Sequence, residues 1–436
     1  MILLVSVRII NSNEITKENV SSYIPRSITQ LDEIKDDATK IINEVKSSGN
    51  KAIIKFTEKF DGVKLNESEI QVTEEEINEA YTLIDKKLLN ALKFAKQNLI
   101  KFHEAQIREE WSIKINKGVE AGQIFRPLES VGLYIPGGRA IYPSTVLMAA
   151  TPAHVAGVQE IIMCSPPQED KKIAPEIIVA AKEFNITKIF KVGGAQAIAA
   201  MAFGTETIPK VQKVIGPGNK WVNAAKQILS NYVAIDNPAG PSEILIIADD
   251  SVNEDFVIID FLSQIEHDPD NVGIIVTSSS ELIDKINKKI ELFIEDSERS
   301  TIIKAALENS LIIKAKDSED CIRISNIIAP EHLELLIKNP KDVIPKVKNA
   351  GAVFLGPYTP VPLGDYCAGT NHILPTGGNA KMYSGLNIND FLKIIPFLEC
   401  NEEGLKTLYD SASTIAKFEG LYAHKESLEK RLKDKD

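Results

Sequence analysis

The sequence has few of the features that mark secreted, disulfide-bonded or membrane proteins. It contains only four cysteines in 436 residues, and these form neither a CxxC motif nor a disulfide-like framework. No stretch approaches the roughly 18 consecutive apolar residues that are needed to cross a bilayer. The apolar N-terminus lacks the basic segment and the small-residue cleavage site of a secretory leader. We therefore expect a reduced, cytoplasmic protein with no membrane partner.

An excess of positive charge is also absent. Lys and Arg total 50 against 61 for Asp and Glu, which gives a net charge of −11. Proteins that bind nucleic acids gain most of their affinity from basic contacts with phosphates, so we expect no nucleic-acid partner. The composition, 44% hydrophobic and 25% charged, is that of a soluble globular protein, and the length indicates two or three domains.

The order of short apolar runs and helical patterns predicts the fold class. From residue 126 onwards, β-rich runs end in glycine and are each followed by a helical pattern, and a second such series occupies 243–355. The predicted strands include 213–215, 243–248, 272–277, 311–314 and 352–355. Repeated strand–turn–helix units require a mostly parallel sheet with helices on both faces. The sequence predicts an α/β fold with two Rossmann-like, incomplete parallel-sheet lobes, N-terminal helices and a C-terminal helical extension. The predicted boundaries are 1–125, 126–236, 237–380 and 381–436.

Several helices are expected outside these units. Ser27 is a plausible N-cap for a helix through Lys46, and one long pattern runs from Thr73 to about Glu109. Residues 321–337 also show a helical pattern, interrupted at Pro330. Segments 356–385 and 403–436 are predicted to be loop-rich and helical, respectively.

Glycine-rich turns follow three of the predicted strands, at 136–138, 193–194 and 216–218. In an open parallel sheet, ligands bind beyond the carboxyl ends of strands, where small residues let a backbone approach phosphates. None of the turns spells GxGxxG or GxxxxGK[ST]. A dinucleotide site and ordinary strand-to-helix turns are therefore both compatible with this spacing.

Histidines with polar neighbours supply candidates for chemistry. Gln264 and His267 stand three residues apart near a helix end, so both can face one metal ion, although polar surface gives the same spacing. His332 beside Glu331 is a possible general base, and a solvated helix start is the alternative. Asp365 lies in a glycine-punctuated loop of the kind in which sites are often built.

The remaining cysteine and histidine candidates are weaker. Cys367 could attack an aldehyde, but a packing role is favoured because no histidine is evidently paired with it. His103 and His154 stand in predicted helices, where surface or core roles are favoured. The aromatic run 418–422 in a charged tail predicts docking onto another surface.

Eight segments stand out in order along the chain: VGLYIPGGRAIYPS (131–144), VGGAQAIAAMAFGT (192–205), VIGPGNKWVNAAK (214–226), DNPAGPSEILIIAD (236–249), LSQIEHDPD (262–270), IAPEHLELL (328–336), GDYCAGTNHILPTGG (364–378) and FEGLYAHKES (418–427). Taken together, these segments resemble the histidinol dehydrogenase family. The resemblance implies an NAD-dependent, zinc-containing homodimer that oxidises L-histidinol to L-histidine through the aldehyde. It also implies that the C-terminal arm completes the partner subunit's site.

The resemblance assigns roles to individual positions. The implied zinc ligands are Gln264, His267, Asp365 and His424. The implied NAD contacts, in the first lobe, are Tyr134, Gln196 and Asn219. The implied substrate contacts are Ser242, Gln264, His267, His332, Asp365, Glu419 and His424. Glu331 and His332 match the catalytic pair, with His332 as the base and Glu331 activating water.

Two other classes of function are compatible with parts of this pattern. A zinc hydrolase could use the same oxygen and nitrogen ligands, although it would not need three glycine-rich strand ends. A scaffold that binds zinc without turnover would be expected to lack the base, whereas the Glu331–His332 pair is present.

Overall fold

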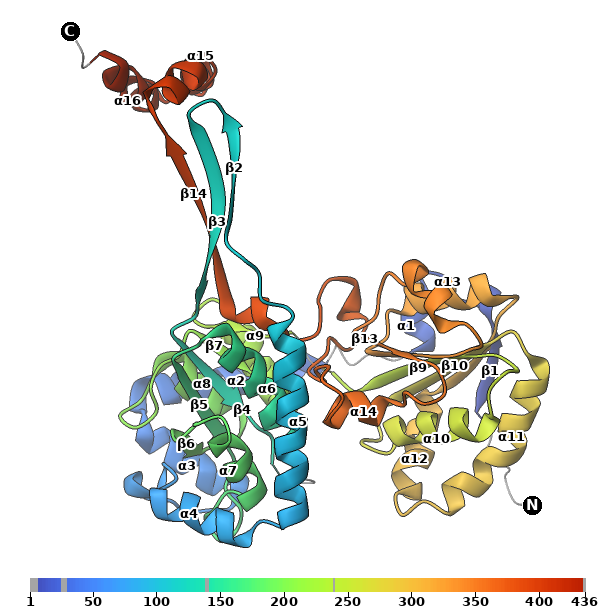
Figure 1. Ribbon diagram of the computed structural model, residues 1–436. Coiled ribbons are helices and arrows are strands. Elements are labelled where there is room, and N and C mark those ends of the chain that lie inside the picture. Colours follow the sequence, from blue (N-terminus) through green and yellow to red (C-terminus); the bar gives the residue numbers. More distant parts are fainter. Residues whose placement is uncertain (1–6, 25–29, 138–140, 238–239, 434–436) are drawn as a thin grey trace.

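The computed structural model describes residues 7–24, 30–137, 141–237 and 240–433, which form two α/β lobes and a projecting arm (Figure 1). The expected cap Ser27 and the third residue of the first glycine-rich turn, Gly138, lie outside these residues. Among the helices described, none is long and apolar enough to cross a membrane.

The first lobe is a five-stranded parallel sheet in the order β6-β5-β4-β7-β8. Its strands are β4 (Ser130–Tyr134), β5 (Glu160–Ser165), β6 (Ile189–Lys191), β7 (Lys213–Ile215) and β8 (Ala234–Ile235). The connecting helices are α6 (Pro143–Ala156), α7 (Pro175–Lys182), α8 (Gly194–Phe203) and α9 (Lys220–Leu229). The strand order reverses between β4 and β7, which is where a doubly wound sheet opens a crevice for a ligand.

The N-terminal helices cover both faces of this first sheet. They are α2 (Gln30–Ser48), α3 (Asn50–Asp61), α4 (Glu74–Leu83) and α5 (Lys86–Glu104). α4 and α5 pack with α6 and α7 around one apolar core, and α2 and α3 pack with α8 and α9 around another. The first lobe is therefore a three-layer sandwich to which residues 30–104 contribute much of the helical covering.

The second lobe is a six-stranded parallel sheet in the order β1-β11-β10-β9-β12-β13. Its strands are β1 (Arg8–Asn11), β9 (Glu243–Ala248), β10 (Val272–Thr277), β11 (Leu311–Lys314), β12 (His332–Leu336) and β13 (Ala352–Leu355). One face is covered by α10 (Glu254–Ile265), α11 (Ser280–Glu295) and α12 (Ser300–Ala306), and the other by α1 (Val20–Tyr23) and α13 (Ser318–Ile328). The chain thus begins in the second lobe, crosses to the first and then returns.

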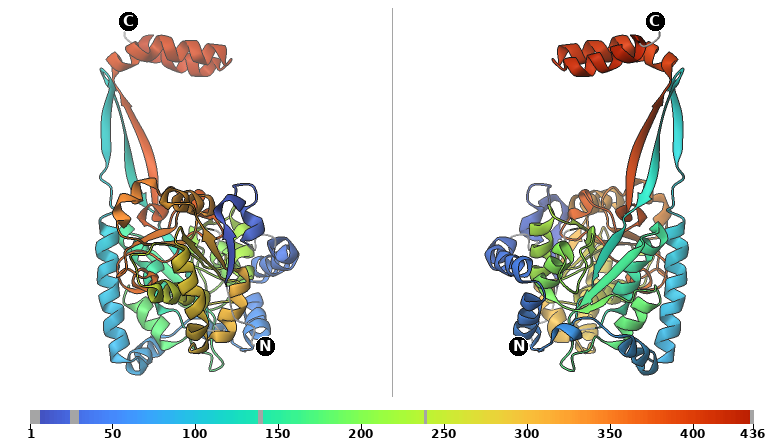
Figure 2. Two further views of the ribbon diagram at one scale, coloured as in Figure 1. Left: turned by 90° about the vertical axis from the view of Figure 1, so that its right-hand side faces the viewer. Right: turned by 90° about the vertical axis from the view of Figure 1, so that its left-hand side faces the viewer.

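A three-stranded antiparallel sheet forms the arm, in the order β14-β3-β2. It consists of β2 (Trp111–Asn116), β3 (Val119–Pro127) and β14 (Leu392–Cys400). At its far end lie α15 (Glu402–Phe418) and α16 (Tyr422–Lys433), away from both lobes in every view (Figures 1 and 2). The sequence did not predict these strands, because β2 and most of β14 are exposed on both faces and so lack the alternation that one buried face imposes.

Two predicted helices are wrong. The pattern from Thr73 to Glu109 is broken after Leu83, because Ile84 is extended and the Asp85 side chain caps a new helix, α5. The segment 321–337 is helical only to Ile328. Its second half is the buried strand β12, which pairs with β9 and β13.

Other predictions are confirmed. The strands expected at 213–215, 243–248, 272–277, 311–314 and 352–355 form with those bounds. In the stretch expected to be loop-rich, a short helix α14 (Val361–Tyr366) also forms.

Candidate active site

The predicted catalytic residues lie at one edge of the second sheet. Ser242 precedes β9, Asn271 precedes β10, and Glu331 precedes β12, whose first residue is His332. These positions are the amino ends of parallel strands, whereas the glycine-rich turns of the first lobe follow carboxyl ends. The second lobe therefore presents its polar residues at the edge opposite to the one that ligands usually occupy in open α/β sheets.

Glu331 and His332 are buried and are both held by the backbone of Glu243, the first residue of β9. The Glu243 N–H donates to Glu331 Oε2 at 2.9 Å, and the Glu243 carbonyl lies 3.1 Å from His332 Nδ1. A carbonyl can only accept, so in the neutral imidazole Nδ1 carries the proton and Nε2 has the free lone pair. Nε2 is buried without a hydrogen-bond partner and lies 3.6 Å from Asp365 Oδ1.

Burial and charge oppose each other in this group. Burial raises the pKa of Glu331 to about 7, although His332 and the Glu243 N–H favour the ionised form. Burial lowers the pKa of His332, but the carboxylates of Glu331 and Asp365 outweigh it and raise that pKa to about 9. Burial alone would raise the pKa of Asp365, and the adjacent His332 instead holds it below its usual value. The site therefore combines a carboxyl group that titrates near neutrality with an imidazole and an ionised carboxylate.

Asp365 lies in the short helix α14 and not in a loop as predicted, and the loop that follows this helix docks the site onto the first lobe. His372 Nδ1 lies 2.9 Å from the Asp365 carbonyl, and its Nε2 lies 3.5 Å from Thr145 Oγ1 in α6. Asn371 Nδ2 donates to the carbonyl of Met148, also in α6, at 2.7 Å. No role was assigned to His372 from the sequence. The available signal was its place in the glycine-punctuated segment that follows Asp365.

The end of α10 brings two further predicted residues to the site. Gln264 is buried in the last turn of the helix, and His267 follows the helix end. His267 is close enough to Asp365 to contribute to lowering the pKa of that carboxyl group. The positions predicted as ligands from the second lobe therefore gather on neighbouring elements.

Asn271 is a positioning residue that the sequence reasoning missed. Its Oδ1 accepts the N–H of Ser242 at 3.1 Å, and its Nδ2 donates to the carbonyl of Gln264 at 2.8 Å. The residue is 2% exposed. A polar residue directly before the predicted strand 272–277 was the available signal, and the bond that it makes across the site depends on the tertiary fold.

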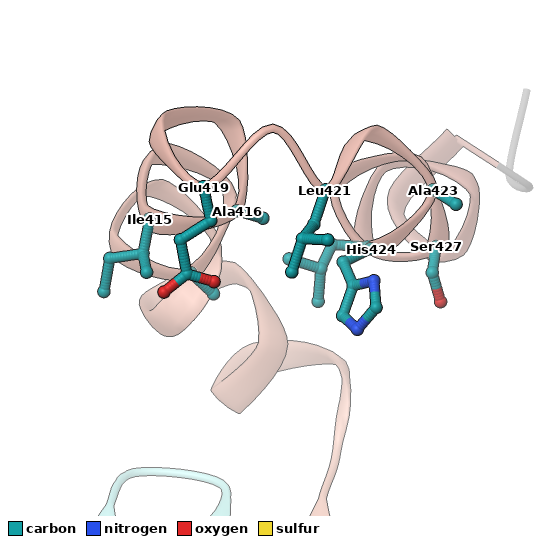
Figure 3. Close-up of a pocket in the computed structure, with 9 residues that line it drawn as sticks. Ile415, Ala416, Glu419, Leu421, Ala423, His424 and Ser427 are labelled. Carbon is teal, nitrogen blue, oxygen red and sulfur yellow. The ribbon is translucent and has the colours of Figure 1, made fainter.

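Glu419 is the C-cap of α15 and His424 lies in α16, and both helices stand at the far end of the arm, away from the second lobe (Figures 1 and 2). Their side chains point to the same open side of a pocket between α15 and α16 (Figure 3). The rest of the pocket is mainly apolar and is lined by Ala412, Ile415, Ala416, Leu421, Ala423, Ser427 and Leu428. In the described part of a single chain, no three His, Cys, Asp or Glu side chains gather as a metal site.

The crevice of the first lobe is built for close approach of backbone segments. Gly216 follows β7 with φ of +127°, and a Cβ there would lie 2.0 Å from the carbonyl oxygen of Tyr134 at the end of β4. Only glycine fits this position. The Tyr134 hydroxyl accepts the N–H of Gly194, the first residue of α8, at 3.1 Å.

The two other predicted NAD contacts, Gln196 and Asn219, differ in burial and in hydrogen bonding. Gln196 is 1% exposed, and neither atom of its side-chain amide has a partner. Such burial costs free energy unless a ligand supplies the missing bonds. Asn219 is exposed, and its side-chain oxygen caps α9 by accepting from the N–H groups of Trp221 and Val222.

The weaker candidates have structural roles. Cys367 packs against the first-lobe core, and its carbonyl accepts from Asn98. His103 is buried, with Nδ1 2.9 Å from the Leu99 carbonyl, whereas His154 is exposed. Cys367 makes the packing contact that was predicted for it, and of the core and surface roles expected for the two histidines, His103 has the first and His154 the second.

Comparison with known proteins gives a consistent result. The family model described as histidinol dehydrogenase matches residues 24–432. A histidinol dehydrogenase from Methanocaldococcus jannaschii is 48% identical over 421 residues, which cover 96% of this chain and 97% of that protein. One from Clostridium acetobutylicum is 47% identical over 394 residues, covering 90% and 91%. The crystal structure of histidinol dehydrogenase from Elizabethkingia anophelis aligns with a TM-score of 0.94 at 39% identity, over 98% of both chains.

Proposed function

The chain belongs to the histidinol dehydrogenase family, and we propose that it oxidises L-histidinol to L-histidine in two NAD-dependent steps at the site around His332. The observation that carries this proposal is the buried Glu331–His332 pair, oriented by one residue of a neighbouring strand. This pair supplies the two proton-accepting groups that the chemistry needs.

His332 acts as the base in the first oxidation. Removal of a hydride from an alcohol carbon requires loss of the hydroxyl proton, and Nε2 has the lone pair to accept it. This role requires a neutral imidazole, whereas the carboxylates of Glu331 and Asp365 raise the pKa of His332 to about 9. A cation held by Asp365 would oppose the contribution of that carboxylate and so favour the neutral imidazole.

Glu331 activates water for the second oxidation. The aldehyde must add water before a second hydride can leave, and a carboxyl group with a pKa of about 7 is suited to accept that proton. The bond from Glu243 N–H fixes one carboxyl oxygen and leaves the other free for water. His332 then serves as the base again.

Zinc fits the donor set that the family resemblance implies. Gln264, His267, Asp365 and His424 offer two oxygen and two nitrogen donors, which suit this borderline ion. Bound there, the metal would act as a template that orients the imidazole and amino groups of the substrate. Ser242, Glu419 and His332 would complete the substrate contacts.

NAD binding is proposed at the crevice of the first lobe. Gln196 supports this placement because its buried amide lacks partners. Tyr134 ends β4 and Asn219 caps α9 after β7, on either side of the reversal point. NAD⁺ would accept one hydride in each oxidation.

A homodimer with shared sites is part of the proposal. The helices α15 and α16, which carry Glu419 and His424, stand away from the second lobe of their own chain (Figure 1), so these residues would join that site from another subunit. We also propose that the enzyme acts in the cytoplasm as a reduced protein, in keeping with its free cysteines.

The test is to incubate the purified, zinc-loaded protein with NAD⁺ and L-histidinol and to follow NADH absorbance. We expect two NADH per histidinol consumed, and His332→Asn should abolish turnover while zinc content and dimerisation stay unchanged. Absence of NADH with zinc bound would refute the proposal and favour a hydrolytic function. Near-normal activity of His332→Asn would refute the assignment of the base.

A further inference from the structure

One carboxylate near the carboxyl ends of the first-lobe strands, that of Asp61, has no part in the proposed NAD contacts. Asp61 is the last residue of α3, outside the parallel sheet. Its Oδ1 lies 3.4 Å from the position that a Cβ on Gly193 would take, so the carboxylate stands against the turn between β6 and α8. It is also close enough to Tyr134 for its charge to act on the pKa of that hydroxyl group.

The position of Asp61 is energetically unfavourable in the protein alone. A negative charge at the C-terminal end of a helix opposes the helix dipole. Oδ2 is buried without a hydrogen-bond partner, and burial raises the pKa of the carboxyl group to about 6. No lysine or arginine contributes to that shift. Natural proteins keep such costly groups mainly where function needs them.

Other unpartnered polar groups surround the same sheet edge. Ser165, the last residue of β5, is 1% exposed and its Oγ has no partner. The amide of Gln196 is equally buried and unpartnered. Pro166, which follows Ser165, lies against the same turn as Asp61, since a Cβ on Gly193 would lie 2.7 Å from its Cβ. Polar atoms of Asp61, Ser165 and Gln196, from three different elements, thus lack hydrogen bonds that a polar ligand would supply.

In doubly wound dinucleotide-binding domains, an acidic residue binds the hydroxyl groups of the adenosine ribose. This residue stands at the end of the strand that lies beside the first strand of the sheet. The equivalent strand here is β5, since it neighbours β4 on the side away from the reversal. It ends in Ser165-Pro166-Pro167-Gln168, which provides no carboxylate. Asp61, at the end of α3, instead places a carboxylate near the end of β5.

We propose that Asp61 binds the hydroxyl groups of the adenosine ribose of NAD⁺ and thereby excludes NADP⁺. The ribose hydroxyls would donate to the carboxylate and offset its burial, whereas a 2′-phosphate would place like charges side by side. This inference rests on the proposed use of NAD.

The test is equilibrium binding, measured by titration calorimetry on the zinc-loaded protein at pH 8 with NAD⁺, NADP⁺ and NAD⁺ lacking the adenosine 2′-hydroxyl. We expect Asp61→Asn to weaken NAD⁺ binding roughly ten- to hundredfold, the range for loss of hydrogen bonds to a charged group. The variant should also lose most of the preference of the wild type for NAD⁺ over NADP⁺ and over the 2′-deoxy analogue. Glu58→Gln, which removes an exposed carboxylate one turn earlier on α3, should bind all three as the wild type does.

A thermal melt without cofactor separates this role from a structural one. If Asp61 serves the ligand, Asp61→Asn should melt no lower than the wild type at pH 8, since an uncompensated charge is removed. A lower melting temperature with unchanged preference among the three ligands would overturn the inference and leave the proposed function intact. Failure of the wild type to bind NAD⁺ would overturn both.

Discussion

At the scale of single residues, the site depends on backbone groups that fix side-chain orientation. The N–H and the carbonyl of Glu243 hold Glu331 and determine which nitrogen of His332 is free. Hydrogen bonds of this kind confer a defined tautomer. The reactive atoms are thus positioned by the start of a neighbouring strand.

Asn271 should affect substrate binding without taking part in chemistry. Asn271→Ala leaves the Ser242 N–H and the Gln264 carbonyl without their partner, which costs about 1–3 kcal/mol for each group that stays buried. We expect a lower melting temperature and a higher KM for histidinol, with kcat reduced less. Steady-state kinetics and thermal melts measure both effects.

Asn309→Ala is the matched control, because Asn309 donates to the carbonyl of Pro269 in the same loop without touching Ser242 or Gln264. Equal changes in KM for the two variants would show that Asn271 acts only through general stability.

At the scale of elements, the contact between α10 and β12 contains two acids, of which Glu334 is buried and Asp260 is half-buried. Glu334 stands two residues after His332 and so shares its face of the strand, and Asp260 stands one turn before Gln264 on the helix. Burial raises the pKa of Glu334 to about 9, with the charge of Asp260 adding to the effect, and burial raises that of Asp260 to about 6. We therefore expect Glu334 to be protonated at neutral pH.

This pair makes stability depend on pH. Since both pKa values are higher in the folded chain than in the unfolded one, protonation stabilises the fold below about pH 4, and this contribution is lost as pH rises through 6 and then 9. Glu334→Gln, which cannot ionise, should lose less stability between pH 6 and 9 than the wild type does. Denaturant unfolding at several pH values measures the difference.

Asp284→Asn, at an exposed position on α11, serves as the control and should follow the wild-type profile. If the Glu334→Gln profile also matched the wild type, the raised pKa of Glu334 would be refuted.

At the scale of the whole molecule, the arm carries residues far from the lobes that they are proposed to serve. Large apolar side chains on it are exposed in the single chain, including Phe418 at 87% and Tyr422 at 69%. Exposed apolar clusters of this kind mark interfaces. A second subunit that covers them would bring Glu419 and His424 to the site around His332.

Mixing two inactive variants tests this arrangement. A dimer of one His332→Asn subunit and one His424→Ala subunit contains one site with both defects and one with neither, provided that the sites are shared. Co-refolding equal amounts should therefore restore about a quarter of wild-type activity, since half of the dimers are mixed. Each variant alone stays inactive, and no recovery from mixtures shown to contain mixed dimers would contradict sharing.

Local sequence determined much of this fold. The strands at 243–248 and 272–277 are short apolar runs between turns, and each formed with the predicted bounds. Gly216 was also evident from its place after a strand, because a close approach of backbones excludes other residues. The polar positions of the site were visible as motifs, and their roles came from resemblance to a family.

Only the tertiary structure decided where those positions meet. Residues 332–336 became a strand because β9 and β13 offer pairing on both sides, which overrides the helical pattern of the segment. The arm strands pair residues near 120 with residues near 396, and Asn271 joins Ser242 to Gln264. Such contacts depend on segments distant in the chain, and periodicity within one segment carries no information about them.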